Sequence, residues 1–452
     1  MTAETSYRLH GARILALALP LIGSHLAQFA VVITDTVMLG WYDVNALAAV
    51  TLGGTLFSNF LLVGSGFAWA AMPMVAKAAA QGEAAQVRRS TRMAMWLSFL
   101  VGLVGLTLFS WAQPVFLLLG QEAEVSAQAA AYLRIAGWGV LPALQVMVLK
   151  SCLSALEHTR VLLVVTIAAA GVNALVNYAL IFGHWGAPEL GLRGAAIASA
   201  LTNSLMLAVL ALYAAVKTRE HALFRRIWRP DREVFARVFS LGWPISLTTF
   251  SEVGLFSAVT VMMGWFGTIA LAAHGIALQL SALAFLVQVG LSQVATIRVG
   301  QALGRDDRAG LRRGALALIF VAAGFAVVPV AMFLALPRPL LALFLDPADP
   351  VRPQVLAIGS RLLAVAALFH FADAGQVLAL GLLRGMQDTR APMLMAAVAY
   401  WPLGLGAAYV LGFPMGLGGV GVWLGLVVGL AAAAGLMMTR FWRAVGLRPV
   451  TR

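Results

Sequence analysis

Three carboxylates lie inside long apolar segments of this 452-residue chain: Asp35, Glu252 and Asp373. A charged side chain at the centre of a bilayer costs about 2.5–3.5 kcal/mol on insertion scales, so such groups usually face a bundle interior or a water-filled cavity. A carboxylate can bind a proton, a hard cation such as Na⁺, or the cationic part of a small molecule. The three acids therefore indicate a pathway for ions or organic cations.

Two amides are predicted to accompany Asp35. Asn173 and Asn177 are spaced i,i+4 in GVNALVNYAL, so they share one side of a helix. With Asp35 they would form a polar cluster able to hold a proton or Na⁺ through oxygens. The same residues also suit hydrogen bonds between helices, worth about 0.6–2 kcal/mol each in membranes.

The other two acids lie in the second half of the chain. Glu252 is near the middle of its apolar segment, where a carboxyl group is far from water and favours its protonated form. Asp373 follows Phe369 and His370 by four and three residues, so the three side chains are predicted to lie on one side of a helix. His370 could hydrogen-bond Asp373 from this position and shift its pKa, but a buried histidine is more often a core group whose hydrogen bonds are satisfied elsewhere.

A second set of residues is predicted to line a substrate cavity rather than to bind the coupling ion. The cavity candidates are Gln28, Phe369, His370 and Gln279. His274 is not among them, because it lies beside a short outer loop and is expected to be exposed.

The composition indicates a polytopic membrane protein. The chain is 61% hydrophobic and 11% charged, with a mean hydropathy of +0.90, and no soluble domain of this size needs so little polar surface. We predict an all-α fold with twelve transmembrane helices. They cover residues 13–40, 45–75, 92–112, 130–152, 160–183, 193–217, 237–265, 269–299, 313–336, 354–381, 391–412 and 419–440.

The net charge of +13 follows from membrane topology. Most of the 31 Lys and Arg residues fall at the termini and in alternate loops, on one side of the predicted spans. The positive-inside rule therefore places both termini in the cytoplasm and removes the reason to expect a nucleic-acid partner. The basic segment 217–237 also contains Leu, Phe, Ile and Trp, which suits either a helix on the anionic inner leaflet or a solvated linker.

The two halves of the chain are related by an internal repeat. An offset of 224 residues, without gaps, places Pro20 on Pro244 and Gly66 on Gly290, and the Arg88-Arg89 pair on Arg312-Arg313. Each copy holds six spans, so both enter the membrane from the same side and are related by a pseudo-two-fold axis along the membrane normal. The predicted parts are an N-terminal six-helix lobe (1–217), a cytoplasmic linker (218–236), a C-terminal six-helix lobe (237–440) and a cytoplasmic tail (441–452).

None of the three acids is duplicated by the repeat. Asp35 falls on Val259 and Glu252 on Gln28, and Asp373 falls on Ala143 at a later offset of 230. This asymmetry favours a task specific to each acid over a shared role in packing.

Three segments resemble the MATE family of multidrug and toxin extrusion transporters. They are LALPLIGSHLAQFAVVITDTVMLG, LGWPISLTTFSEVGLFSAVTVMMGWFG and DAGQVLALGLLRGMQDTRAPM, and the resemblance extends over essentially the whole chain. The acids in the seventh and tenth spans resemble the NorM branch. The resemblance implies an antiporter of the bacterial inner membrane that exports organic cations by alternating access of two lobes, driven by H⁺ or Na⁺.

In relatives thought to bind Na⁺ in the second lobe, a Tyr often stands where this chain has Phe369. That departure favours H⁺, whereas the oxygen-rich set Asp35, Asn173 and Asn177 leaves Na⁺ open. Possible Na⁺ at either set of acids is the only metal expected, and we expect no cofactor and a monomer.

Other function classes are less well supported. An enzyme would need a catalytic or ATP-binding motif such as HExxH or a P-loop, and the sequence has neither. The closest alternative is a flippase of a lipid-linked or amphipathic substrate with the same two-lobe architecture. Its pyrophosphate substrate would require a strongly cationic cavity, whereas most Arg and Lys lie outside the apolar spans.

Overall fold

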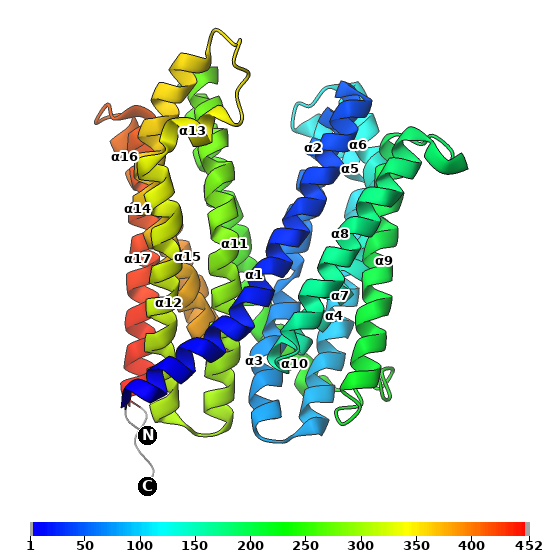
Figure 1. The fold of residues 1–452 in the computed structure, drawn as a ribbon, viewed down its shortest axis with the longest axis vertical. Coiled ribbons are helices and arrows are strands. Elements are labelled where there is room, and N and C mark those ends of the chain that lie inside the picture. Colours follow the sequence, from blue (N-terminus) through cyan, green and yellow to red (C-terminus); the bar gives the residue numbers. More distant parts are fainter. Residues whose placement is uncertain (1–2, 448–452) are drawn as a thin grey trace. The chain divides into compact units, whose positions relative to one another are not determined.

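A computed structural model describes the backbone of residues 3–447, and the side chains of 10–43 and 46–446 (Figure 1). Within this part of the chain, twelve helical segments are long and apolar enough to cross a membrane, which confirms the predicted all-α fold. The helices of the first half are α1 (Ala3–Tyr42), α2 (Val44–Gly64), α3 (Gly66–Ala80), α4 (Ala84–Ser110), α5 (Ala112–Leu118), α6 (Ala123–Ala136), η1 (Gly137–Gly139), α7 (Val140–Ala155), α8 (Thr159–Phe182), η2 (His184–Gly186) and α9 (Leu192–Lys217).

The helices of the second half follow the same sequence of spans. They are α10 (Arg232–Gly264), α11 (Thr268–Gly304), α12 (Arg308–Ala335), α13 (Pro337–Ala342), α14 (Arg352–Gly385), α15 (Arg390–Val398), η3 (Ala399–Leu405), α16 (Gly406–Gly412) and α17 (Gly418–Leu447). The eleventh span is interrupted by η3, a turn of π-helix that contains Pro402. Proline lacks the backbone N–H that a regular helix requires, and a widened turn is a common way to accommodate it.

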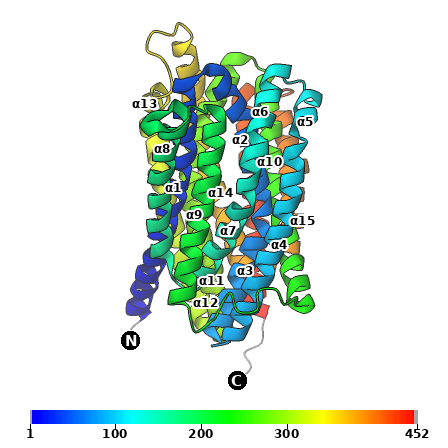
Figure 2. The same ribbon diagram turned by 90° about the vertical axis from the view of Figure 1, so that its right-hand side faces the viewer.

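The chain packs as two compact units, and one of them consists of residues Gly23–Ser246. In this unit α7 contacts α3, α4 and α9, which run side by side in Figure 2. One hydrophobic cluster lies around the fully buried Phe109 and Leu133, and a second surrounds Met93 and Val238. These clusters leave the polar positions of α8 and α9 next to the second half of α1, where they can form a site.

The other unit consists of Met1–Ile22 together with Leu247–Arg452. Its central helix is α14, which packs against α11, α12 and α17 (Figure 1). Large side chains fill the contact with α17, where Trp423 and Phe441 are fully buried. Because α14 carries Asp373, the acid is placed in the middle of this unit.

The division between the units falls inside α1 and α10 rather than in the predicted linker. Two close contacts accompany it, in which Gly66 lies against Ser246 and Gly290 lies against Ile22. The two contacts are equivalent in the sequence repeat, because Ser246 lies 224 positions after Ile22 and Gly290 lies 224 positions after Gly66. The start of each half, 1–22 or 232–246, therefore packs with the rest of the other half. The lobe boundaries 1–217 and 237–440 stay a prediction from the sequence.

The segment between α9 and α10 is a series of turns, so the alternative of a surface helix is wrong. Left-handed backbone at Ala222 and Arg226, with φ of 44° and 55°, interrupts a helix there. The carbonyl groups of the segment instead accept hydrogen bonds from side chains spaced i, i+4 and i+8 on α4. Arg88 donates to His221 O (3.5 Å), Arg92 to Arg226 O (3.2 Å) and Trp96 Nε1 to Ile227 O (2.8 Å).

An ion pair fastens the end of this segment. Arg89 Nε donates to Asp231 Oδ2 at 2.5 Å and Arg89 Nη2 to Asp231 Oδ1 at 3.2 Å. The hydrogen bond from the guanidinium lowers the pKa of the Asp231 carboxyl from its usual value. The ion pair therefore stabilises the docked segment at neutral pH, and this contribution disappears as the pH falls through the lowered pKa.

Asp231→Asn is expected to loosen the segment 218–231 at neutral pH by on the order of 1 kcal/mol, because the pair is partly open to solvent. Hydrogen exchange of the segment, corrected for the intrinsic pH dependence of exchange, should be about fivefold faster in the variant at pH 7. The unchanged protein should begin to approach the variant below pH ~4, the usual Asp range, and should match it only once the pH has fallen through the lowered pKa of Asp231. Equal exchange of the two proteins at pH 7 would contradict this role of Asp231.

Candidate functional site

The structure brings Asp35 together with both predicted amides. Asn177 Nδ2 donates to Asp35 Oδ1 at 2.5 Å and to Asn173 Oδ1 at 3.0 Å, which joins α1 to α8. A third contact was not predicted, in which Ser199 Oγ of α9 donates to Asp35 Oδ2 at 3.1 Å. Both carboxylate oxygens thus accept a hydrogen bond, and such donors stabilise an ionised carboxylate.

The two amides retain unused hydrogen-bonding atoms. Asn173 and Asn177 are both fully buried. Asn177 Oδ1 and Asn173 Nδ2 have no hydrogen-bond partner among the residues that the structure describes. A buried polar atom without a partner is costly, so an additional ligand next to Asp35 would find an acceptor and a donor in place. The arrangement suits a cationic group or a hydrated ion at the Asp35 carboxylate.

Asp373 lies in a different environment from Asp35. Its side chain is 1% exposed on α14. Neither carboxylate oxygen has a hydrogen-bond partner within the described part of the chain. A buried carboxyl without donors is stable as the neutral acid or with a cation bound to its oxygens. This site therefore needs a proton or another cation to complete it.

The hydrogen bond that His370 could make to Asp373 is not formed within the described part of the chain, and neither is the alternative of a satisfied core histidine. His370 is fully buried, and both of its ring nitrogens lack a partner among the described residues. The two residues lie three positions apart on α14, which puts them on the same side of the helix but does not make their side chains meet.

Four further polar groups belong to the surroundings of Asp373. Gln376 Nε2 donates to Tyr400 Oη at 2.6 Å, and both side chains are fully buried. The charge of Glu252 on α10 acts on Asp373, on Tyr400 and on Arg384 near the end of α14. The two acids of this unit, Glu252 and Asp373, therefore belong to one electrostatic cluster. The sequence does not single out Gln376 and Tyr400 as members of it, because both residue types are common in apolar helices.

The π-helical turn η3 places aromatic side chains against this cluster. Tyr400 and Trp401 immediately precede Pro402, which widens the turn. Trp401 Nε1 donates to Ser251 Oγ at 2.8 Å, next to Glu252 on α10. Widened turns of this kind occur frequently at functional sites. The proline in the eleventh span is the sequence signal for this turn.

His274 is a buried part of this unit, so the expectation that it is exposed is wrong. Trp423 Nε1 donates to His274 Nδ1 at 3.1 Å, and His274 Nε2 lies 3.1 Å from Thr260 Oγ1. Because the indole is a donor only, Nδ1 accepts and the ring proton resides on Nε2. The neutral ring is then fully paired and fixes α11 to α10 and α17. A sequence position next to an outer loop does not reveal that the side chain points inward.

The four predicted cavity residues fall into two groups. Gln28 and Gln279 are exposed on their units. Phe369 and His370 are buried, and Phe369 packs edge-on against Phe256 and Trp423, with ring centroids 6.0 and 5.6 Å apart. The two glutamines are thus exposed side chains and Phe369 and His370 are packed inside their unit. The assignment of all four to a substrate cavity stays a prediction.

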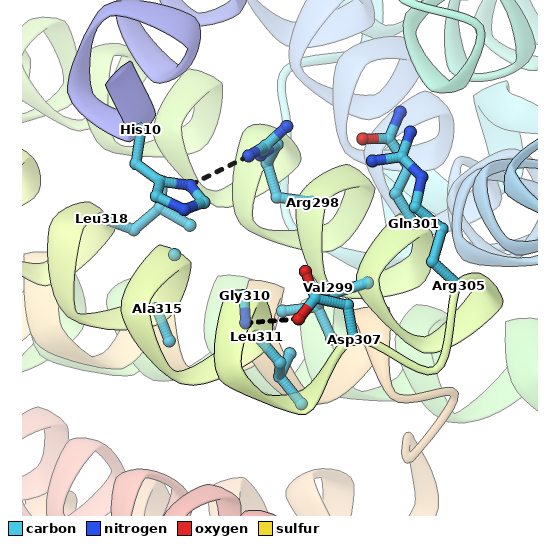
Figure 3. A pocket seen from close by; sticks show the side chains of 12 residues that line it. His10, Arg298, Val299, Gln301, Arg305, Asp307, Gly310, Leu311, Ala315 and Leu318 are labelled. Atoms are coloured by element: carbon cyan, nitrogen blue, oxygen red, sulfur yellow. Dashed lines mark hydrogen bonds between the residues drawn. The ribbon is translucent and has the colours of Figure 1, made fainter. Parts of the chain in front are cut away.

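A pocket of about 30 Å³ lies elsewhere, where the first turns of α1 meet α11 and α12. Figure 3 shows His10 pointing toward Arg298, which donates to His10 Nδ1 at 3.1 Å, and Asp307 capping the start of α12 at Gly310. A volume of this size holds about one or two water molecules. The pocket is therefore too small for an organic substrate, and none of the three acids lines it.

Comparison with known proteins finds the same family in both halves of the chain. The MatE family model matches residues 20–179 and again 244–410. The two matches begin at Pro20 and Pro244, the pair that the sequence repeat aligns. A protein named "Probable multidrug resistance protein NorM" from Rhizobium meliloti (strain 1021) is 44% identical over 98% of this chain and 95% of its own. One of the same name from Agrobacterium fabrum is 43% identical over 94% of this chain and 92% of its own.

Solved structures share the fold. The eukaryotic MATE transporter AtDTX14 superposes with a TM-score of 0.87 at 18% identity, over 98% of this chain and 97% of its own. An outward-facing multidrug resistance MATE transporter of the MOP superfamily gives 0.88 at 18% identity, over 97% and 96%. The family match in both halves and the long, close alignment with the NorM relatives confirm the resemblance drawn from the sequence. The chain is a polytopic membrane protein that belongs to the MatE family.

Proposed function

We propose that this chain exports organic cations from the bacterial cytoplasm in exchange for protons, by alternating access of its two lobes. The relatives named probable multidrug resistance proteins support efflux of several drugs. The observation that carries the coupling is Asp373, a buried acid whose oxygens have no partner among the described residues. Binding and release of a proton there would change the charge of the site once in each cycle.

The two sites are suited to different ligands. Asp35 already accepts hydrogen bonds from Asn177 and Ser199, which stabilise its ionised form and so favour attraction of an organic cation. Asp373 has no such donors. Phe369, next to Asp373 on α14, supplies no oxygen that a Na⁺ ion would require. Proton binding at Asp373 and Glu252, with cation binding at Asp35, fits these differences, and Na⁺ at Asp35, Asn173 and Asn177 is the competing assignment.

The remaining features of the proposal follow from the sequence and the relatives. The excess of Lys and Arg in alternate loops supports cytoplasmic termini, and the bacterial relatives support the cytoplasmic membrane. The partners are small organic cations and lipid, without a cofactor or nucleic acid, and the protein acts as a monomer.

A pH gradient is expected to drive uptake of a fluorescent organic cation into liposomes that contain the purified protein, with the interior acidic and no Na⁺ present. A Na⁺ gradient at equal pH should give less than about one tenth of that rate, if coupling is through protons alone. Protein-free liposomes and an added protonophore provide the controls. Transport that responds only to the Na⁺ gradient would exclude the proton assignment and favour Na⁺ at the Asp35 cluster.

A further inference from the structure

Lys150 is a basic side chain inside the fourth span, Ala123–Ala155. Its Nζ lies 3.4 Å from Gln28 Oε1 on α1, a neutral acceptor. Among the described residues no carboxylate oxygen lies within 4.0 Å of this ammonium. The positive charge is therefore not neutralised within its own unit.

The position of Gln28 shows that this charge is not simply drawn to the membrane surface. Lys150 lies five residues before the end of α7, about 8 Å along the helix, and a lysine so placed can extend toward the interface. Its ammonium instead reaches Gln28, which is near the middle of the span His10–Tyr42. Gln28 is exposed and Lys150 half-buried, so the pair is accessible at the surface of the unit. An unpaired charge at that depth is stable only next to water or a polar ligand, not next to lipid.

Gln28 and Asp35 lie on the same side of α1. They are seven residues apart, which corresponds to two helical turns and about 10 Å. One stripe of the helix therefore presents the carboxylate of Asp35 and, held by Gln28, the ammonium of Lys150. An organic cation requires only the first of these groups, whereas a molecule with an ammonium and a carboxylate could pair with both.

We propose that Lys150 is a specificity-determining residue that binds the carboxylate of zwitterionic amphiphiles while Asp35 binds their cationic group. The inference rests on the proposed export of organic cations and assigns a residue to the recognition of those substrates that also carry a carboxylate. Lys150 would then exchange a weak hydrogen bond to a neutral amide for a charge-assisted one to the substrate. Gln28, the repeat equivalent of Glu252, keeps the ammonium in place without neutralising it.

The test compares rhodamine 110, which carries a free carboxylate, with its methyl ester rhodamine 123, which lacks one. Equilibrium binding to the purified protein in nanodiscs is measured by fluorescence anisotropy for the unchanged chain, Lys150→Gln and Lys150→Arg. We expect Lys150→Gln to weaken rhodamine 110 binding at least about tenfold at neutral pH, as loss of a charge-assisted contact requires, and to weaken rhodamine 123 at most about twofold. Lys150→Arg should retain most of the binding of rhodamine 110.

Three outcomes would overturn the proposal: no binding of rhodamine 110 to the unchanged protein, equal weakening of both dyes in Lys150→Gln, or no weakening of either. Because binding is measured without a gradient, the result is separate from the export proposal. Rhodamine 123 that binds but is not transported in liposomes would contradict export and leave the role of Lys150 standing.

Discussion

Asp373→Asn is expected to reduce proton-driven export of an organic cation by about 100-fold, equivalent to roughly 2.7 kcal/mol in the limiting step. The amide has nearly the size of the acid but cannot bind and release a proton. Because the carboxyl lies in the middle of its unit without hydrogen-bond partners among the described residues, no neighbouring donor replaces its function. Glu252→Gln should have an effect in the same direction, since Glu252 acts electrostatically on Asp373. The measurement is cation uptake driven by a pH gradient in liposomes.

The matched control is Asp346→Asn, the same chemical change at an acid between α13 and α14, outside the predicted spans. Its rate should stay within about twofold of the unchanged protein, as expected for a surface position. Asp373→Asn should still bind the cation without a gradient, because Asp35 is intact. A rate for Asp373→Asn equal to that of the control would remove Asp373 from the coupling mechanism.

Gly66→Ala is expected to destabilise the protein by at least about 2 kcal/mol, because the added methyl group would overlap backbone atoms. A Cβ at Gly66 would lie 2.6 Å from Ser246 N and 2.8 Å from Gly242 O. Neither backbone can move without shifting α10 away from α3. The unfolding midpoint of the detergent-purified protein, followed by tryptophan fluorescence, should fall clearly.

Gly290→Ala provides the comparison, because Gly290 is the repeat equivalent of Gly66. The nearest atom to its added Cβ is Ile22 Cγ1 at 2.7 Å, in a side chain that can rotate, and the nearest backbone atom is Ile22 N at 3.2 Å. A loss of about 1 kcal/mol is therefore expected. Equal midpoints for the two variants would show that the close approach of α10 to Gly66 does not limit stability.

The fold was predictable from the sequence because its signals are long and repeated. Twelve apolar segments, an even number per repeat and the bias of Lys and Arg each point to the same arrangement. The exchange of partners within α1 and α10 was not predictable in this way. A continuous apolar helix has the same sequence pattern whether its two ends pack in one unit or in two. The tertiary contacts distinguish the cases, among them those at Gly66 and Gly290.

The residues of the candidate site were predictable from the sequence where a polar side chain stands alone in an apolar helix. An acid or a pair of amides in an apolar helix is conspicuous, so Asp35, Asn173 and Asn177 could be grouped before their contacts were known. Ser199 could not, because serine is common in membrane helices and only its position across from Asp35 gives it a role. The same holds for Tyr400, whose place depends on the widened turn at Pro402.

Predictions of single contacts were less secure than predictions of helices. The distance between His370 and Asp373 depends on side-chain torsions that helical spacing does not determine. The segment after α9 mixes Arg with apolar residues, and this composition predicts a membrane-surface helix as well as it predicts a linker. The partners that decide its structure, Arg88, Arg92 and Trp96, belong to α4, far away in the sequence.

The exchange of helix ends between the halves has a consequence for how such a chain could arise. A cut within residues 218–231 would produce two fragments of six spans, yet each packing unit contains a piece of both fragments, 1–22 in one case and 232–246 in the other. Neither fragment alone could complete its own core. An ancestor half as long would thus have required a second copy to fold, as in a domain-swapped dimer, and gene fusion would have made that obligate pair a single chain.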